Sequence, residues 1–159
     1  MDDTSRSARK RESEALQKLG TELVRLHDQE LARISLPPEL AEAVALARRL
    51  PKGGGLRRQM QHIGALMRRI DAEPIRTALD ALRHEWADAA GALHEVEHWR
   101  DRLLHEGDAA IDALLREHPA GDAARLRRLI AEARHDSAAN KPPRAARELF
   151  RYLRDAVLR

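Results

Sequence analysis

The chain has no cysteine, few aromatic residues and no long hydrophobic run. Without cysteine it can form no disulfide, no thiol nucleophile and no thiolate metal site. Aromatic residues make up 3% of its 159 residues, so a large core built around rings is excluded. Small helical bundles of Leu, Ile and Met fit this composition. No segment approaches the roughly 18 apolar residues of a membrane-spanning helix, and the first residues lack the apolar core of a signal peptide. We therefore expect a cytoplasmic protein with no membrane partner.

Helical periodicity runs along almost the whole chain. β-branched residues are scarce and apolar residues recur three or four positions apart, which predicts an all-α fold. Proline and glycine divide the pattern into helices expected at about Ser7–Ile34, Glu39–Leu50, Leu56–Ile70, Pro74–Glu106, 108–118, 123–140 and Arg144–Leu158. The fourth helix would be about 50 Å long. We therefore expect an elongated molecule, with helical bundles in residues 1–72 and 107–159 joined by a linking helix, 73–106.

Glycine and aspartate mark several expected helix ends. Lys52 and the three glycines 53–55 predict a flexible turn, and Gly107-Asp108 predicts a stop followed by a new N-cap. Asp122 is expected to cap the helix that follows it. Gly64 lies inside an expected helix, where glycine costs up to about 1 kcal/mol relative to alanine. Close approach of another backbone would explain it.

Charge is sorted into blocks along the chain. Residues 43–70 hold seven basic residues and no acid, whereas residues 71–122 hold thirteen acids and five bases. A cationic block on a nearly neutral protein favours a polyanionic partner, such as the phosphate backbone of a nucleic acid. The alternative is a solvated helix face in an arginine-rich chain, since 25 of the 29 basic residues are arginine.

Two helices are expected to carry basic stripes. At about 100° per residue, Arg57, Arg58, Arg68 and Arg69 lie opposite the apolar side of the third helix. Four arginines of the last helix, Arg144, Arg147, Arg151 and Arg154, fall within a wedge of under about 90°. The candidate RNA-binding residues are Arg57, Arg58, Arg68, Arg69, Arg48, Arg49, Lys52, Lys141, Arg144, Arg147, Arg151 and Arg154.

Residues 94–98 match the H-E-x-x-H pattern of zinc metalloproteases. His94 and His98 would share a helix face, as zinc ligands do. However, Glu97 places a charge inside the motif, and Asp101 and Leu104 stand where the extended motif needs glycine and a third histidine. The alternative, an ordinary polar helix face, is favoured, and we expect no metal site, no cofactor and no catalytic residue.

The few aromatic residues allow two interpretations. Trp86 and Trp99 could stack on bases, but their helical spacing among leucines favours a place in the core. Phe150 and Tyr152 lie beside the C-terminal arginines, where a ring could pack against helices or stack on an exposed nucleotide.

Six segments, spread in order over nearly the whole chain, carry a family resemblance. They are EALQKLG (14–20), RRQMQHIGALMR (57–68), EPIR (73–76), HWRDRLL (98–104), NKPPR (140–144) and RELFRYLR (147–154). Together they resemble the dual-action ribosomal maturation protein family, DarP. The resemblance implies an all-helical bacterial cytoplasmic protein that binds late precursors of the large (50S) ribosomal subunit and assists maturation of the peptidyl-transferase centre.

The resemblance also implies a partner and excludes others. The partner would be 23S rRNA within the subunit precursor; no catalysis and no small-molecule substrate are implied, and we expect a monomer. The alternative is a helical protein–protein adaptor whose long helix presents Trp or Leu to a partner helix. A zinc-dependent hydrolase using His94 and His98 is the remaining hypothesis.

Overall fold

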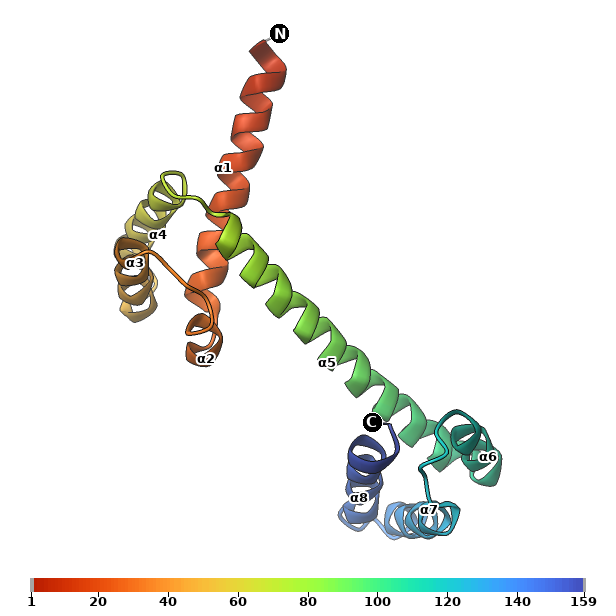
Figure 1. Ribbon diagram of the computed structural model, residues 1–159. Helices are drawn as coiled ribbons and strands as arrows, with labels where there is room; N and C mark the ends of the chain where they lie inside the picture. Colours follow the sequence, from red (N-terminus) through yellow and green to blue (C-terminus); the bar gives the residue numbers. More distant parts are fainter. Residues whose placement is uncertain (1, 159) are drawn as a thin grey trace. The chain divides into compact units, whose positions relative to one another are not determined.

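The computed structural model describes residues 2–158, with side chains from residue 6 onward, and within that range it contains helices and no strand. The all-α prediction is confirmed. The chain divides into two compact units, one ending at Glu85 and the other beginning at Trp86. The helices, drawn in Figure 1, are α1 (Asp2–Arg25), α2 (Asp28–Leu31), α3 (Pro38–Arg49), α4 (Gly54–Met67), α5 (Glu73–Glu106), α6 (Asp108–Glu117), α7 (Ala123–Ala138), α8 (Arg144–Tyr152) and the π-helix η1 (Leu153–Val157).

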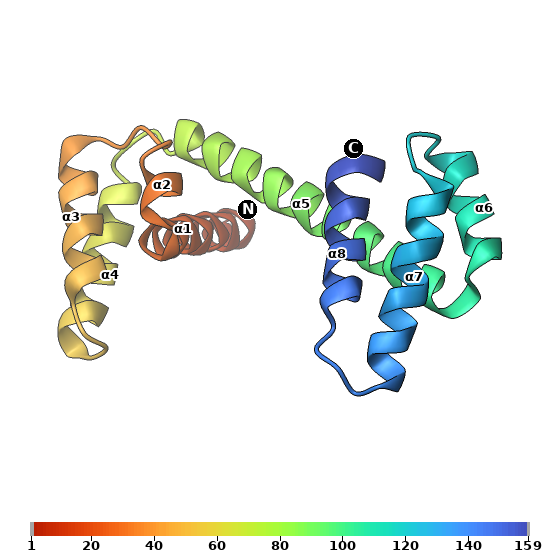
Figure 2. The ribbon, with the colours of Figure 1, turned by 90° about the horizontal axis from the view of Figure 1, so that it is seen from below.

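The first unit is built on mutual packing of α1, α3 and α4. Each presents one apolar face, and α3 and α4 lie side by side (Figure 2). The first turns of α5 add Ile75, Leu79 and Leu82 to the same core. Leu23, Leu40 and Ile63 are fully buried at its centre, and each such side chain contributes about 2 kcal/mol of burial free energy.

The first helix is shorter than the sequence predicts. It ends at Arg25, and His27 has an extended backbone with φ −67° and ψ 156°. The His27 amide donates to the Glu30 carboxylate at 3.0 Å, which starts the one-turn helix α2. The apolar spacing continues through this break because Leu26 and Ile34 still face the core. Apolar periodicity therefore could not indicate where the first helix ends.

Two glycine predictions for α4 are wrong. Gly54 and Gly55 form its first turn rather than a flexible turn, and only Gly53 precedes the helix, with φ 156°. Gly64 faces the side-chain amide of Gln17 and not another backbone. A Cβ at position 64 would overlap that amide, which donates to the Met60 carbonyl oxygen at 3.1 Å. Glycine leaves room for this bond between α1 and α4.

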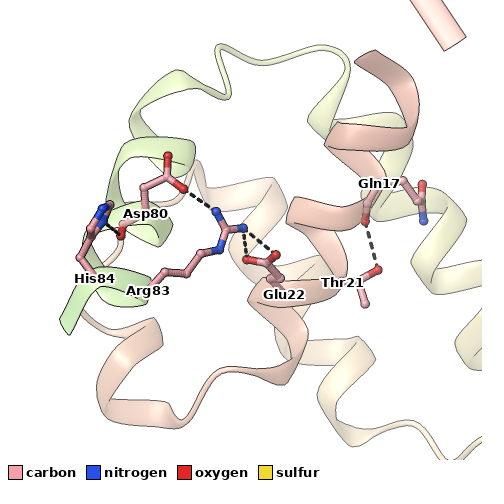
Figure 3. Close-up of polar contacts among 6 residues, drawn as sticks. All are labelled: Gln17, Thr21, Glu22, Asp80, Arg83 and His84. Carbon is pink, nitrogen blue, oxygen red and sulfur yellow. Dashed lines mark hydrogen bonds and ion pairs between the residues drawn. The ribbon is translucent and has the colours of Figure 1, made fainter. Parts of the chain in front are cut away.

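Polar contacts attach the start of α5 to α1 (Figure 3). The Arg83 guanidinium lies between two carboxylates, donating to both oxygens of Glu22 at 2.6 Å and to Asp80. These contacts raise the pKa of Arg83, the hydrogen bond to Glu22 most of all. Helix α5 begins at Glu73, with Pro74 in its first turn as expected, and continues unbroken through Gly91.

The second unit consists of the rest of α5 with α6, α7, α8 and η1. Helix α7 packs against both α6 and α8. As predicted, Asp122 caps α7, accepting from the amides of Ala124 and Arg125 at 2.9 and 3.2 Å. Gly107, with φ 66°, is the N-cap of α6, so the cap stands one residue before the Asp108 that the sequence suggested. The last helix is not α-helical throughout, because it widens to a π-helix over residues 153–157.

The core prediction holds for Trp99 and fails for Trp86. Trp99 is buried in the core of the second unit. Trp86 is 44% exposed and Leu93, seven positions later, is 47% exposed. Residues 83–95 of α5 are all exposed, so helical spacing alone did not distinguish core positions from this solvated stretch.

Candidate nucleic-acid interface

The four arginines expected on the third helix are all exposed. Arg57 and Arg58 lie in the first turns of α4, whereas Arg68 is its C-cap and Arg69 follows in the turn. Arg69 is 3.6 Å from the Glu39 carboxylate of α3. We call Arg57, Arg58, Arg68 and Arg69 the N-terminal arginine set. Because α4 packs through its other face, their side chains project away from the core.

Of the three neighbouring basic residues, Arg48 has a structural role, and Arg49 and Lys52 lie on the surface. Arg48 donates to the carbonyl oxygens of Val24 and Leu26 and pairs with Asp28, and its side chain is only 22% exposed. It therefore closes the C-terminal end of α1, where a cation also meets the negative end of the helix dipole. Arg49 and Lys52 are exposed.

The second unit brings four arginines around one groove of about 980 Å³. Arg144, Arg147 and Arg151 come from α8 at helical spacing, and Arg100 joins them from α5. The one carboxylate that lines the groove is Glu148, which is 4.0 Å from Arg125. We call this feature the α8 groove; its other lining residues are Leu104, Pro143, Ala146 and Phe150.

The α8 groove combines cations with an apolar surface. Leu104, Pro143 and Ala146 line it together with the half-buried ring of Phe150. The Arg100 guanidinium lies 5.9 Å from the centre of that ring and also contacts its neighbour Asp101 at 2.7 Å. A guanidinium over a ring is a favourable cation–π arrangement, and both groups are flat surfaces that can stack.

The remaining predicted residues of the second unit lie outside the α8 groove. Arg154 is bound by the neighbouring Asp155 carboxylate at 2.6 and 3.0 Å, and the hydrogen bond to it raises the pKa of Arg154. Lys141 is exposed, with Nζ 3.5 Å from Nε2 of His135. The structure therefore brings three of the four arginines of the last helix together, and it adds Arg100.

Arg100 is the residue that charge patterning missed. It lies in the acid-rich stretch of α5, so a count of charges by block passes over it. One local signal was present: Leu104 follows it by four positions on the same helix face, and that face meets α8. Whether such a face meets a basic helix is decided by packing between residues 40 to 50 positions apart.

The aromatic residues of the last helix have different environments. Tyr152 is 8% exposed, and its hydroxyl accepts a hydrogen bond from the Asp122 amide at 2.8 Å. The guanidinium of Arg125 covers its ring at 4.3 Å. Tyr152 thus secures α8 to the start of α7, which leaves Phe150 as the ring at the groove.

The two histidines of the H-E-x-x-H pattern lie on a polar surface. His94 is 80% exposed and contacts Glu97 at 3.5 Å, and His98 packs edge-on against Trp99. Among the side chains that the structure describes, those of residues 6–158, no three His, Asp or Glu converge as metal ligands would. Within the same described range, no helix has the length and apolar character that a membrane crossing requires.

The fold and site define an all-helical protein in which two separate sets of exposed arginines offer phosphate-binding chemistry. Comparison with known proteins narrows this class. The family model described as dual-action ribosomal maturation protein DarP matches residues 2–154. The chain belongs to this family.

Named relatives align along most of their own length. The dual-action ribosomal maturation protein DarP of Thiobacillus denitrificans is 50% identical over 156 residues, covering 98% of this chain and 88% of the relative. The protein of the same name from Idiomarina loihiensis is 48% identical, covering 98% and 92%. That of Vibrio cholerae is 46% identical, covering 97% and 79%.

Proposed function

We propose that this protein is a non-enzymatic assembly factor that binds late precursors of the large ribosomal subunit through rRNA phosphates. The family membership supports a role in ribosomal maturation. The exposed N-terminal arginine set is the observation that supports RNA contact. By binding 23S rRNA in its mature arrangement, the protein would favour maturation of the peptidyl-transferase centre, since a ligand shifts an equilibrium toward the state it binds better.

Arginine suits this task for a geometric reason. A guanidinium is planar and permanently charged, and it donates two parallel hydrogen bonds to one phosphate. Arg57 and Arg58 are held by the first turns of a packed helix, which reduces the entropy lost on binding. Backbone contacts of this kind position the protein on RNA without reading base identity.

Two binding surfaces on one chain would act as linked tethers. The N-terminal arginine set belongs to the first unit and the α8 groove to the second. Once one surface is bound, the other binds at a raised effective concentration, which increases avidity for an RNA that offers both contacts. The acidic residues in the exposed stretch of α5, residues 83–95, would repel RNA phosphates from that stretch. The protein would act as a cytoplasmic monomer.

A charge-reversal experiment tests the proposal. We expect the double variant Arg57→Glu/Arg58→Glu to lose co-sedimentation with large-subunit precursors at moderate salt, while the unmodified protein remains bound. Arg116→Glu/Arg128→Glu is the matched control, because it makes the same charge change at exposed positions of α6 and α7. Equal loss in both variants would indicate a general charge effect, and retention by the first would exclude this surface.

The exposed stretch of α5 favours a second candidate function. Trp86 and Leu93 lie seven positions apart on one helix face and are both substantially exposed. A helical protein–protein adaptor would use such a face against a partner helix. Nuclease treatment separates the two functions, because an adaptor retains its partner after RNA is digested and an RNA-bound factor is released.

A further inference from the structure

The α8 groove has an apolar lining that phosphate binding alone does not require. Phosphates need donors on an accessible surface, but Arg144, Arg147 and Arg151 border a hollow lined by a phenylalanine ring, leucine and proline. Its volume of about 980 Å³ lies near the upper end of the range for sites that enclose small organic molecules. The ligand should therefore combine negative charge with a flat, weakly polar body.

We infer that the α8 groove holds an unpaired nucleotide of an RNA strand, with its base against Phe150 and its flanking phosphates on the α8 arginines. This inference rests on the proposed RNA-binding function and names the RNA element that the second unit takes. Paired bases are stacked inside a duplex and cannot reach a ring, so the nucleotide must be bulged, looped or single-stranded.

The spacing on α8 fits a strand rather than a single ion. Arg144 and Arg151 are seven residues apart, about 10 Å along the helix, with Arg147 between them. Phe150 lies on the turn between Arg147 and Arg151, so a base entering beside its ring would leave phosphates near arginines. Arg100 lies 5.9 Å from the ring centre, and its planar group can stack on the base or bind a phosphate.

Charge and shape together favour RNA over an acidic protein segment. Three guanidinium groups of α8 line the groove against one carboxylate, Glu148, and the fourth, Arg100, is paired with Asp101, so the lining favours an anionic occupant. An aspartate- or glutamate-rich segment would satisfy the arginines and leave the ring and Leu104 uncovered. A nucleotide supplies both the phosphate and the aromatic surface.

The test uses the full chain and matched RNA hairpins that differ at one position. One hairpin carries a single bulged adenosine, the second is fully paired, and the third carries an abasic bulge. Binding is measured by fluorescence anisotropy at about 0.15 M salt. We expect the adenosine bulge to bind about tenfold more tightly than the paired hairpin, as one base–aromatic stack would give. The abasic bulge should bind like the paired hairpin.

A protein variant locates the preference in the groove. Phe150→Leu keeps an apolar side chain in the half-buried position but removes the ring, and it should abolish the preference while leaving affinity for the paired hairpin unchanged. Arg128→Ala on α7, at an exposed position outside the groove, should retain the preference. Circular dichroism melts check that each variant is folded. If Phe150→Leu is unstable, Arg144→Ala/Arg147→Ala replaces it. Relative to the unmodified protein, we expect this variant to lose more affinity for the bulged hairpin than for the paired one.

The outcomes separate this inference from the proposed function. If both hairpins bind equally well, or if folded Phe150→Leu keeps the preference, the groove does not hold a base, although RNA binding stands. If a glutamate-rich peptide displaces the bulged hairpin and the Arg144→Ala/Arg147→Ala variant no longer binds that peptide, the groove takes an acidic protein segment. If no hairpin binds even in dilute salt, the proposed RNA function itself is wrong.

Discussion

The two units place their exposed arginines in different surroundings. In the first unit the N-terminal arginine set lies at the two ends of α4, and residues 1–85 contain no Phe, Tyr or Trp. In the second unit Arg144, Arg147 and Arg151 border a groove that also contains Phe150. A set of guanidinium groups alone can bind any phosphate backbone, whereas cations beside a ring can distinguish an unpaired nucleotide from a paired one. The same residue type can therefore serve attachment in one unit and selection in the other.

The units also share one use of arginine. Arg48 closes the end of α1 through the carbonyl oxygens of Val24 and Leu26. Arg134 does the same for α5, donating to the carbonyl oxygens of Leu104 and His105 at 2.9 and 3.3 Å. Each satisfies carbonyl groups that have no partner within their helix. Basic residues of this chain thus divide into those that stabilise helix ends and those available to a ligand.

The largest expected effect tests whether the two cores are independent. Leu23→Ala in the first unit and Leu126→Ala in the second each remove a fully buried side chain, which should lower the free energy of unfolding by about 3 kcal/mol. Hydrogen exchange measured by mass spectrometry should show lost protection in the altered unit alone. Equal loss across both units would mean that they unfold together. Leu46→Ala, at a 42% exposed position, is the control.

The next effect compares the two arginine surfaces in RNA binding. Arg57→Ala/Arg58→Ala and Arg147→Ala/Arg151→Ala should each reduce the slope of log K against log salt by about 2, since each arginine lost is one phosphate contact. Titrations with the paired hairpin at several salt concentrations measure the slope. Only the second double variant should also weaken the preference for a bulged adenosine. An unchanged slope in either variant would show that its two arginines do not contact RNA phosphates.

A smaller effect concerns the two arginines at helix ends. Arg48→Ala and Arg134→Ala should each lower the free energy of unfolding by about 1 kcal/mol, because main-chain carbonyl oxygens lose charged donors. Chemical denaturation followed by circular dichroism measures the change. Arg49→Ala, exposed beside Arg48, should leave stability unaltered. If Arg48→Ala weakened RNA binding without changing stability, its role would be that of a ligand contact instead.

The smallest effect is a pH dependence in the first unit. Arg33 binds the Glu85 carboxylate at 2.6 and 2.9 Å, and this hydrogen bond lowers the pKa of Glu85. Because the folded-state pKa is below the unfolded value of about 4.3, the unfolded state binds the proton more readily as pH falls. The Arg33–Glu85 pair therefore stabilises the fold at pH values above the unfolded pKa of Glu85, and this stabilisation is lost as pH falls through the folded pKa of Glu85.

A single variant isolates this contribution. The difference in unfolding free energy between the unmodified protein and Glu85→Gln should be greatest near neutral pH and shrink in acid. Both side chains are more than half exposed, so salt should reduce the difference as well. A difference that stayed constant with pH would show that the ion pair does not contribute.

Most of the helical architecture could be predicted from the sequence. Apolar spacing located α3 and α5 to within one or two residues, and proline or glycine marked most boundaries. The failures have a common cause. The break at His27, the π-helical end of the chain and the burial of Gly64 against Gln17 depend on contacts with other helices, which a local pattern does not contain.

The candidate interface was predictable only as a set of charges. Arg57, Arg58 and Arg147 are exposed as their positions indicated, but nothing local separates Arg48 from Arg49. One of these neighbours points back to the carbonyl oxygens of α1 and the other toward solvent. The positions of Arg48 and Phe150 relative to other helices decided which groups remain available to a ligand.

The amino-acid sequence by itself determined the helical class, the absence of thiol chemistry and the sorting of charge, because these follow from composition and from periodicities of three or four residues. Tertiary structure alone decided that Arg100 joins the α8 arginines, that the Tyr152 hydroxyl accepts a hydrogen bond from the Asp122 amide, and that Trp86 remains exposed. The physical reason is that such contacts join residues 30 to 50 positions apart, where only the packing of whole helices sets which side chains meet.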